Sequence, residues 1–220
     1  VTLLKRSPIS DLANIQQCLA DISNATQLAD ALPPAIDIIL YCLSPVEFSD
    51  AGYHKVFPEG VHNLLTALKQ RKRQGKQLPK RIFFVSSTSV YSQNGNEIIN
   101  ELSPTDPSAF SGKALIDGES QLLNSDIPAT IVRFSGIYGG NRTRLLEQAL
   151  KGELSTKHEG PFTNRIHETD CIGVLAHLIQ REINQQPLEN IYLASDCEPV
   201  QTHIIATWFR QQMHCEPESA

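Results

Sequence analysis

A cluster of hydroxyl side chains follows a strongly apolar segment in the first half of the chain. Residues 82–85 are apolar without interruption, and residues 86–89 add four hydroxyl groups directly after them. Such a hydroxyl can donate a hydrogen bond to a substrate alcohol or carbonyl oxygen while a proton or hydride moves. Serine and threonine are also common caps and turn formers, so the cluster could simply end a strand. The position of the segment in the fold decides between these roles.

Segments typical of strands alternate with segments typical of helices along the whole chain. The strands that we expect are residues 1–4, 14–19, 36–43, 81–87, 129–134 and 190–195, and the helices are 25–32, 57–68, 112–123, one from 169, and 200–212. Nearly continuous apolar runs of strand length are typical of parallel strands buried on both faces. The alternation predicts an α/β fold with a doubly wound parallel sheet. Ligands bind at the carboxyl ends of such strands, which places the hydroxyl cluster where a site is expected.

Composition excludes several classes of function. The chain has 220 residues, a net charge of -5, 40% hydrophobic and 20% charged residues, which is typical of a soluble globular protein without a nucleic-acid partner. No apolar run approaches the roughly 20 residues that cross a bilayer. The five cysteines are scattered and no histidine pair has metal-ligand spacing, so we expect reduced thiols, a cytoplasmic protein and no metal. The basic run at 69–81 lacks aromatic residues and fits a solvated helix end.

Several motifs in a fixed order resemble a known family. SSTSVY at 86–91, a helix bearing a lysine, IVRFSGIYGG at 131–140 and RIHETD at 165–170 resemble the extended short-chain dehydrogenase/reductases, the NAD(P)-dependent epimerases and dehydratases. The resemblance covers nearly the whole chain. It implies a Rossmann-like NAD(P)-binding domain in residues 1–139 and a small substrate-side lobe in 140–220, interleaved with the last elements of the sheet. The implied substrate is a sugar nucleotide or a similar hydroxyl-bearing small molecule.

The resemblance also implies a role for individual residues. Ser87 matches the catalytic Ser/Thr of the family, with Thr88 as its alternative, and Lys113 matches the lysine that contacts the nicotinamide ribose. Asp21 and Ile22 match the pair at the adenine ring. The other matched positions are Cys42, Leu43, Ser44 and Arg133 beside the cofactor, and Tyr91, Tyr138, His167 and Asp170 on the substrate side. From the residues alone, Lys113 could instead pair with Asp117, Asp21 could be a turn residue and His167 a structural histidine.

The first departure from the family pattern is at the start of the chain. Family members bind pyrophosphate at a glycine-rich turn between the first strand and the first helix, and this sequence contains no such turn. Residues 1–4 match the second strand of the family. We therefore expect that one βα unit is missing from this chain as given, which would leave apolar strand edges exposed. The alternative is a short protein that has lost its phosphate site.

The second departure from the family pattern is at the residue that acts as the general acid/base. The family motif Y-x-x-x-K would place a tyrosine four residues before Lys113, where this chain has Ala109. The next residue, Phe110, carries the ring without the hydroxyl. Tyr91 and Tyr138 are candidate substitutes. The missing tyrosine keeps a second class open, a cofactor-binding sensor or regulatory protein without turnover, and a third is a structural fragment that binds no nucleotide.

The end of the first expected strand predicts which cofactor is bound. NAD sites usually place a carboxylate there for the ribose 2′-hydroxyl, whereas NADP sites place a basic residue for the 2′-phosphate. Here Lys5 and Arg6 follow Leu4. We predict NADP rather than NAD, held by Arg6 with help from Lys5. The resemblance further implies a homodimer paired through the helices at 57–68 and 112–123.

Overall fold

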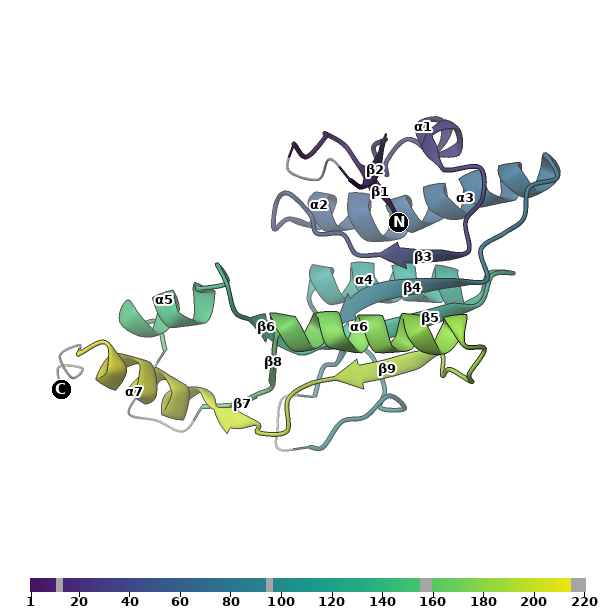
Figure 1. Cartoon of the computed structure of the whole chain (residues 1–220). Helices are drawn as coiled ribbons and strands as arrows, with labels where there is room; N and C mark the ends of the chain where they lie inside the picture. Colours follow the sequence, from purple (N-terminus) through teal and green to yellow (C-terminus); the bar gives the residue numbers. More distant parts are fainter. Residues whose placement is uncertain (11–13, 94–96, 155–159, 215–220) are drawn as a thin grey trace.

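A parallel four-stranded sheet forms the centre of the computed structural model, which describes residues 1–10, 14–93, 97–154 and 160–214 (Figure 1). Its strands, in spatial order, are β3 (Ile38–Tyr41), β4 (Arg81–Ser87), β5 (Ala129–Phe134) and β9 (Ile191–Ala194). The register pairs Phe84 with Ile131 and Ser86 with Arg133. A second parallel pair, β1 (Thr2–Lys5) and β2 (Gln16–Leu19), lies beyond β3. The predicted α/β fold with a parallel sheet is confirmed.

Alternate residues of the central strands pack against helices on opposite faces. Ile82 and Phe84 of β4 belong to the core shared with α3 (Gly60–Arg73) and α4 (Phe110–Leu123). Phe83, between them, belongs to the core beneath α6 (Glu168–Ile183). All three are fully buried. Because successive side chains of a strand point to opposite faces, a strand covered on both sides must be apolar at every position. This requirement explains why residues 82–85 contain no polar residue.

The helices before β4 begin and end at residues typical of helix boundaries. α1 (Ala25–Ala31) begins at Asn24, whose side chain accepts a hydrogen bond from the backbone of Gln27, and it ends just before Pro33 and Pro34. α2 (Asp50–His54) begins at the side-chain cap Ser49 and continues through a π-helical segment, η1 (Lys55–Glu59), into α3. Pro58 lies inside this segment and has no N–H to donate, which accounts for the wider turn. In the described part of the chain, no helix is long and apolar enough to span a bilayer.

The C-terminal third adds short elements to one side of the sheet (Figure 1). They are β6 (Gly136–Tyr138), α5 (Arg144–Leu150), β7 (Phe162–Thr163), β8 (Arg165–His167), β10 (Val200–Gln201) and α7 (Thr202–Gln212). A further short element, the 3-10 turn η2 (Thr88–Val90), directly follows β4. β6 pairs with β8 in parallel, and β7 pairs with β10 in an antiparallel ladder. Strands of two or three residues carry no periodic signal, so none of these four strands was predicted.

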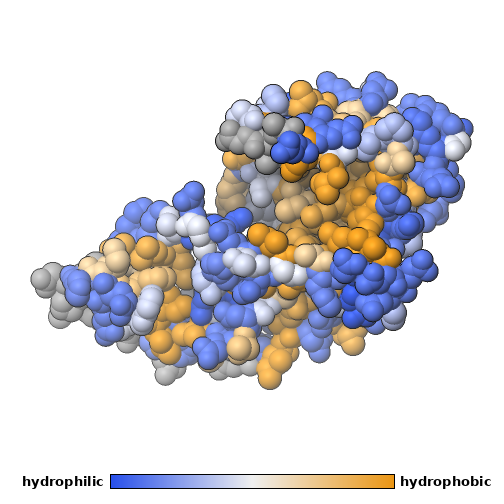
Figure 2. Space-filling view, viewed as in Figure 1, coloured by the Kyte–Doolittle hydropathy of each residue, from blue (hydrophilic) through white to orange (hydrophobic). Residues whose placement is uncertain are grey.

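An apolar gap separates β1 from β3. Among the described residues β1 has a ladder only with β2, and β3 has a ladder only with β4. Leu40, in the middle of β3, is 42% exposed although its strand is nearly all apolar. Figure 2 shows hydrophobic residues gathered in the hollow at this place. The facing edges of β1 and β3 share no backbone ladder in the described residues.

A buried arginine joins α3 to the segment between α1 and β3. Arg71 is 1% exposed, and its guanidinium donates hydrogen bonds to the carbonyls of Leu32, Pro33 and Pro34. We predict that Arg71→Met lowers the free energy of unfolding by about 2 kcal/mol, because buried carbonyls lose their donors. Urea denaturation measures this, with Arg73→Met as the control because Arg73 is exposed on the same helix. Equal stability of the two variants would contradict the prediction.

Candidate active site and nucleotide cleft

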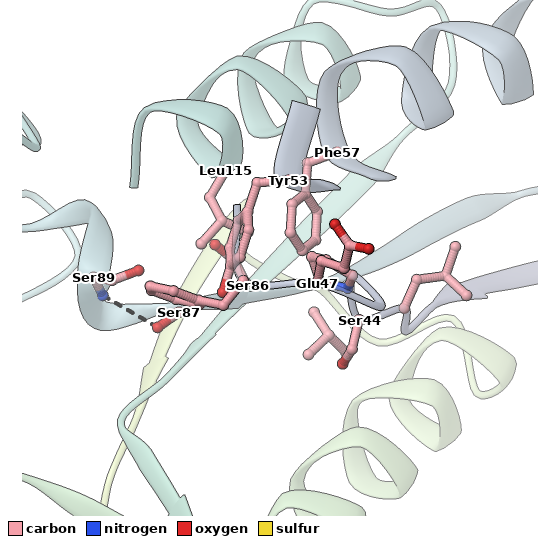
Figure 3. A pocket seen from close by; sticks show the side chains of 12 residues that line it. Ser44, Glu47, Tyr53, Phe57, Ser86, Ser87, Ser89 and Leu115 are labelled. Atoms are coloured by element: carbon pink, nitrogen blue, oxygen red, sulfur yellow. Dashed lines mark hydrogen bonds between the residues drawn. The ribbon is translucent and has the colours of Figure 1, made fainter. Parts of the chain in front are cut away.

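Two adjoining cavities open at the carboxyl ends of β1, β3 and β4. The smaller has a volume of about 270 Å³ and is lined by Ser86, Ser87 and Ser89 together with side chains that precede and form α2 (Figure 3). The larger has a volume of about 610 Å³ and lies between the ends of β1 and β3. Leu43, Ser44 and Glu47 line both cavities. The two cavities share this wall and together form a cleft region at the sheet edge where α/β proteins bind ligands.

Ser87 caps the turn after β4 and also lines the smaller cavity. It is the last residue of β4, and its Oγ accepts a hydrogen bond of 3.2 Å from the backbone N–H of Ser89, which caps η2. An oxygen that accepts this bond still carries its own hydrogen, which it can donate into the smaller cavity. Thr88 follows it but is not among the residues that line either cavity. The hydroxyl cluster is therefore both a strand cap and one wall of the cavity.

A buried ionic network lies behind the serine wall. Glu119 on α4 and Arg133 on β5 form two hydrogen bonds, of 2.6 Å from Nη2 and 3.2 Å from Nε, and Ser86 donates to the same carboxylate. Burial alone would lower the pKa of Arg133, but the hydrogen bond and charge of Glu119 outweigh it and hold that pKa above its ordinary value. The network fixes the position of Ser86, the residue next to Ser87.

Tyr91 belongs to this network. Its hydroxyl accepts a hydrogen bond of 2.9 Å from Arg133 and donates one of 3.0 Å to the carbonyl of Asn100. The guanidinium of Arg133 also lies over the Tyr91 ring, 5.1 Å from its centroid. A phenol that already donates and accepts has little capacity to move a proton to or from a ligand. Of the two tyrosines that the sequence offers as substitutes for the family base, Tyr91 is thus engaged elsewhere.

The larger cavity gathers seven of the residues that the sequence predicts at the cofactor. They are Lys5, Arg6, Asp21, Ile22, Cys42, Leu43 and Ser44. The strand that was predicted at 36–43 ends at Tyr41, so Cys42, Leu43 and Ser44 lie after the strand and line the cavity. Hydrogen bonds from the backbone and side chain of Ser23 hold the pKa of Asp21 below its ordinary value, so its carboxylate is ionised at neutral pH.

Other predicted site residues lie outside both cavities. Lys113 is exposed on α4, where Asp117 accepts a hydrogen bond from Gln121 instead. Tyr138 is 43% exposed on β6 and contacts His167 edge to face, with ring centroids 5.2 Å apart. His167 accepts a hydrogen bond from the backbone of Thr169 through Nδ1 and so caps α6, whose first turn contains Asp170. The structure thus gives His167 a structural role at the start of that helix.

The glycine pair after Tyr138 is required by close packing. Gly139 and Gly140 both have positive φ, and a Cβ on Gly139 would lie 2.6 Å from Nε2 of His167. A Cβ on Gly140 would meet the carboxylate of Glu168 at the same distance. Only glycine tolerates this combination of conformation and space. The pair therefore holds β6 against the start of α6.

Sequence reasoning missed the aromatic wall of the smaller cavity. Phe48, Tyr53 and Phe110 contact one another, with ring centroids between 5.2 and 5.5 Å apart. Phe48 and Tyr53 line the cavity, and Phe57 adds a fourth ring next to Tyr53. Residues 45–53 show no helical or strand periodicity, so the only signal was the local density of aromatic residues.

Among the described residues, no cluster of His, Cys, Asp or Glu could hold a metal ion.

A Rossmann-like sheet with a cleft at its carboxyl edge defines a class of nucleotide-binding proteins. No family model matches the chain, and no curated protein matches it. A solved structure from Methylobacillus flagellatus, assigned to the NAD-dependent epimerase/dehydratases, is 31% identical, has a TM-score of 0.77, and is matched over 100% of this chain and 75% of that one. The chain therefore belongs to the NAD-dependent epimerase/dehydratase family.

More distant solved structures share the fold. WbmG of Bordetella bronchiseptica, solved with NAD and UDP, is 14% identical with a TM-score of 0.73, over 100% of this chain and 72% of that one. The UDP-N-acetylglucosamine 4-epimerase of Bacillus cereus is 17% identical with a TM-score of 0.69, over 97% of this chain and 75% of that one. At these identities the likeness shows the fold alone.

Proposed function

We propose that the protein is an NAD(P)-dependent epimerase, dehydratase or reductase that acts on a sugar nucleotide or a similar hydroxyl-bearing small molecule. The observation that carries the proposal is the pair of adjoining cavities: seven of the residues predicted at the cofactor line the larger one, and Ser87 lines the smaller one. Family membership supports it. So do the NAD and UDP bound by WbmG and the UDP-sugar epimerase activity of the Bacillus cereus relative.

The residues present suit the two ends of a dinucleotide. Asp21 and Ile22 would border the adenine, and Leu43 and Ser44 would lie where the larger cavity continues into the smaller one. Bound nicotinamide supplies a site that accepts or donates hydride. Ser87 would donate its hydroxyl hydrogen to the reacting oxygen of the substrate and stabilise negative charge that develops there.

Cofactor choice should follow the two basic residues at the end of β1. Lys5 and Arg6 line the larger cavity, where the 2′-phosphate of NADP would add negative charge. We predict that NADP binds more tightly than NAD and that Arg6→Ala weakens NADP binding about tenfold without changing NAD binding. Isothermal titration measures both affinities. The control is Lys80→Ala, an exposed lysine that pairs with Asp37 outside the cleft. Equal affinity of the wild-type protein for the two cofactors would refute the predicted preference.

One observation favours a second candidate, a cofactor-binding sensor without turnover, because Ala109 replaces the family tyrosine. One experiment distinguishes the enzyme from the sensor. UDP-glucose, UDP-galactose and UDP-N-acetylglucosamine are incubated with the protein and each cofactor, and products are resolved by chromatography because epimerisation leaves no net change in the nicotinamide. Conversion of a sugar supports the enzyme, whereas cofactor binding without any conversion, including that of simple carbonyl compounds with NADPH, supports the sensor.

A further inference from the structure

The family tyrosine is absent, but another tyrosine hydroxyl is available in the cleft. The chain contains five tyrosines. The hydroxyl of Tyr41 donates to the carbonyl of Val56, that of Tyr91 lies in the Arg133 network, and that of Tyr192 accepts from the backbone of Glu189. Tyr138 lies on β6 outside both cavities. Tyr53 is the remaining one, and it lines the smaller cavity.

The ring of Tyr53 is held in place by its neighbours. Its edge-to-face partners Phe48 and Phe110 each have a ring centroid 5.5 Å from its own, and Phe57 lies at the same distance. In Figure 3 the ring extends from its helix toward the end of β4, where Ser86 and Ser87 lie. In the parts of the chain that the structure describes, the Tyr53 hydroxyl has no hydrogen-bond partner. A fixed ring with an unengaged hydroxyl is suited to contact a ligand.

Tyr53 also lies beside the position that the family tyrosine would occupy. α4 begins after Ala109, and its first residue, Phe110, packs its ring against Tyr53. Tyr53 on α2 is therefore separated from position 109, the residue before α4, by one ring contact. A phenol that reaches the same cavity from a different helix can serve the same chemistry, because geometry and not chain position decides the role.

We propose that Tyr53 supplies the acid/base hydroxyl that is missing at position 109 and acts together with Ser87. This inference rests on the proposed function. In the reducing direction, the substrate carbonyl carbon receives a hydride from the reduced nicotinamide, and the electron pair of the C=O double bond moves to the oxygen. That oxygen takes the proton of Tyr53, leaving a phenolate that regains a proton from water. In the oxidising direction the phenolate takes the alcohol proton as hydride leaves the carbon.

The electrostatic surroundings agree with the reducing direction. Burial raises the pKa of Tyr53, and the positive charge of Arg144 on α5 opposes this shift only in part. The hydroxyl is therefore protonated at neutral pH and can donate. Glu47, which lines both cavities, is the acidic side chain that lines the smaller cavity together with Tyr53.

The first test is a pair of matched substitutions. Tyr53→Phe removes one oxygen, and we expect turnover to fall about thirtyfold while the affinity for NADP changes less than about twofold. Tyr192→Phe makes the same chemical change far from the cleft and should retain turnover. Adding Ala109→Tyr to Tyr53→Phe restores a phenol in the family position and should recover part of the loss. A Tyr53→Phe protein as active as the wild type would overturn this inference and leave the proposed function standing.

A second readout needs no turnover. N-acetylimidazole acetylates accessible tyrosine hydroxyls, and mass spectrometry of peptides locates each modified residue. We expect Tyr53 to be modified and NADP with UDP-glucose to slow its modification at least fivefold, with Tyr192, which lines neither cavity, as the internal reference. Modification of Tyr53 at the same rate with and without these ligands, or none at all, would overturn the inference. Failure of the wild-type protein to bind either dinucleotide would instead overturn the proposed function itself.

Discussion

Ser87→Ala is expected to lower turnover about a thousandfold and to change NADP affinity by less than about twofold. The Ser87 oxygen accepts a hydrogen bond from the backbone N–H of Ser89 and lines the smaller cavity, so its own hydrogen can be donated to a ligand there. Alanine keeps the strand and removes both this donor and the oxygen that caps η2. Steady-state kinetics with the sugar nucleotide that the panel identifies, together with isothermal titration of NADP, measure the two quantities.

The control for this substitution is Ser120→Ala, an exposed serine on α4. It should match the wild-type protein in both measurements. Thr88→Ala distinguishes the two sequence candidates, because Thr88 does not line the cavity and Ser87 does. A greater loss of turnover with Thr88→Ala than with Ser87→Ala would show that the structure assigns the donor to the wrong residue.

Glu119→Leu is expected to lower the free energy of unfolding by about 4 kcal/mol. Glu119 is 2% exposed and carries the only counter-charge that contacts the Arg133 guanidinium among the described residues. Removing one partner of a buried ion pair leaves the other charge without compensation, which typically costs about 3–5 kcal/mol. Urea denaturation of Glu119→Leu and the wild-type protein measures the difference.

The double variant Glu119→Leu with Arg133→Met tests the cause. It removes both charges and replaces both side chains with apolar ones. Its free energy of unfolding should therefore exceed that of Glu119→Leu alone by about 2 kcal/mol or more. The single variant should also lower turnover, because Ser86 loses its acceptor next to Ser87. A double variant less stable than the single one would mean that packing around Glu119, and not the orphaned charge, governs the loss.

The fold was predictable where a strand is buried on both faces. β4 contains the unbroken apolar run 82–85, β5 is apolar apart from Thr130 and Arg133, and the structure places both strands at the positions expected from the sequence. The strand at 36–43 was predicted too long because Cys42 and Leu43 are apolar but belong to the cleft. Hydropathy does not distinguish a side chain buried by helices from one that faces a ligand.

The site was predictable only in part. Ser87 and the residues at the ends of β1 and β3 could be found from motif order, because each follows a strand directly. Arg133 was predicted beside the cofactor, and its ion pair with Glu119 was not predicted because it depends on how α4 packs against β5. Tyr53 gave no signal, because its place in the cleft results from contact between α2 and α4. The roles assigned to Lys113, Tyr138 and His167, and the homodimer through α3 and α4, stay predictions.

The most direct test is the titration of NADP and NAD against the purified protein. We predict a Kd in the micromolar range, which corresponds to a binding free energy of about −8 kcal/mol. NADP should bind more tightly than NAD, and the two should compete for one site. A protein that unfolds in one cooperative transition but binds neither dinucleotide would contradict this prediction, because the cleft between β1, β3 and β4 would then not be a nucleotide site.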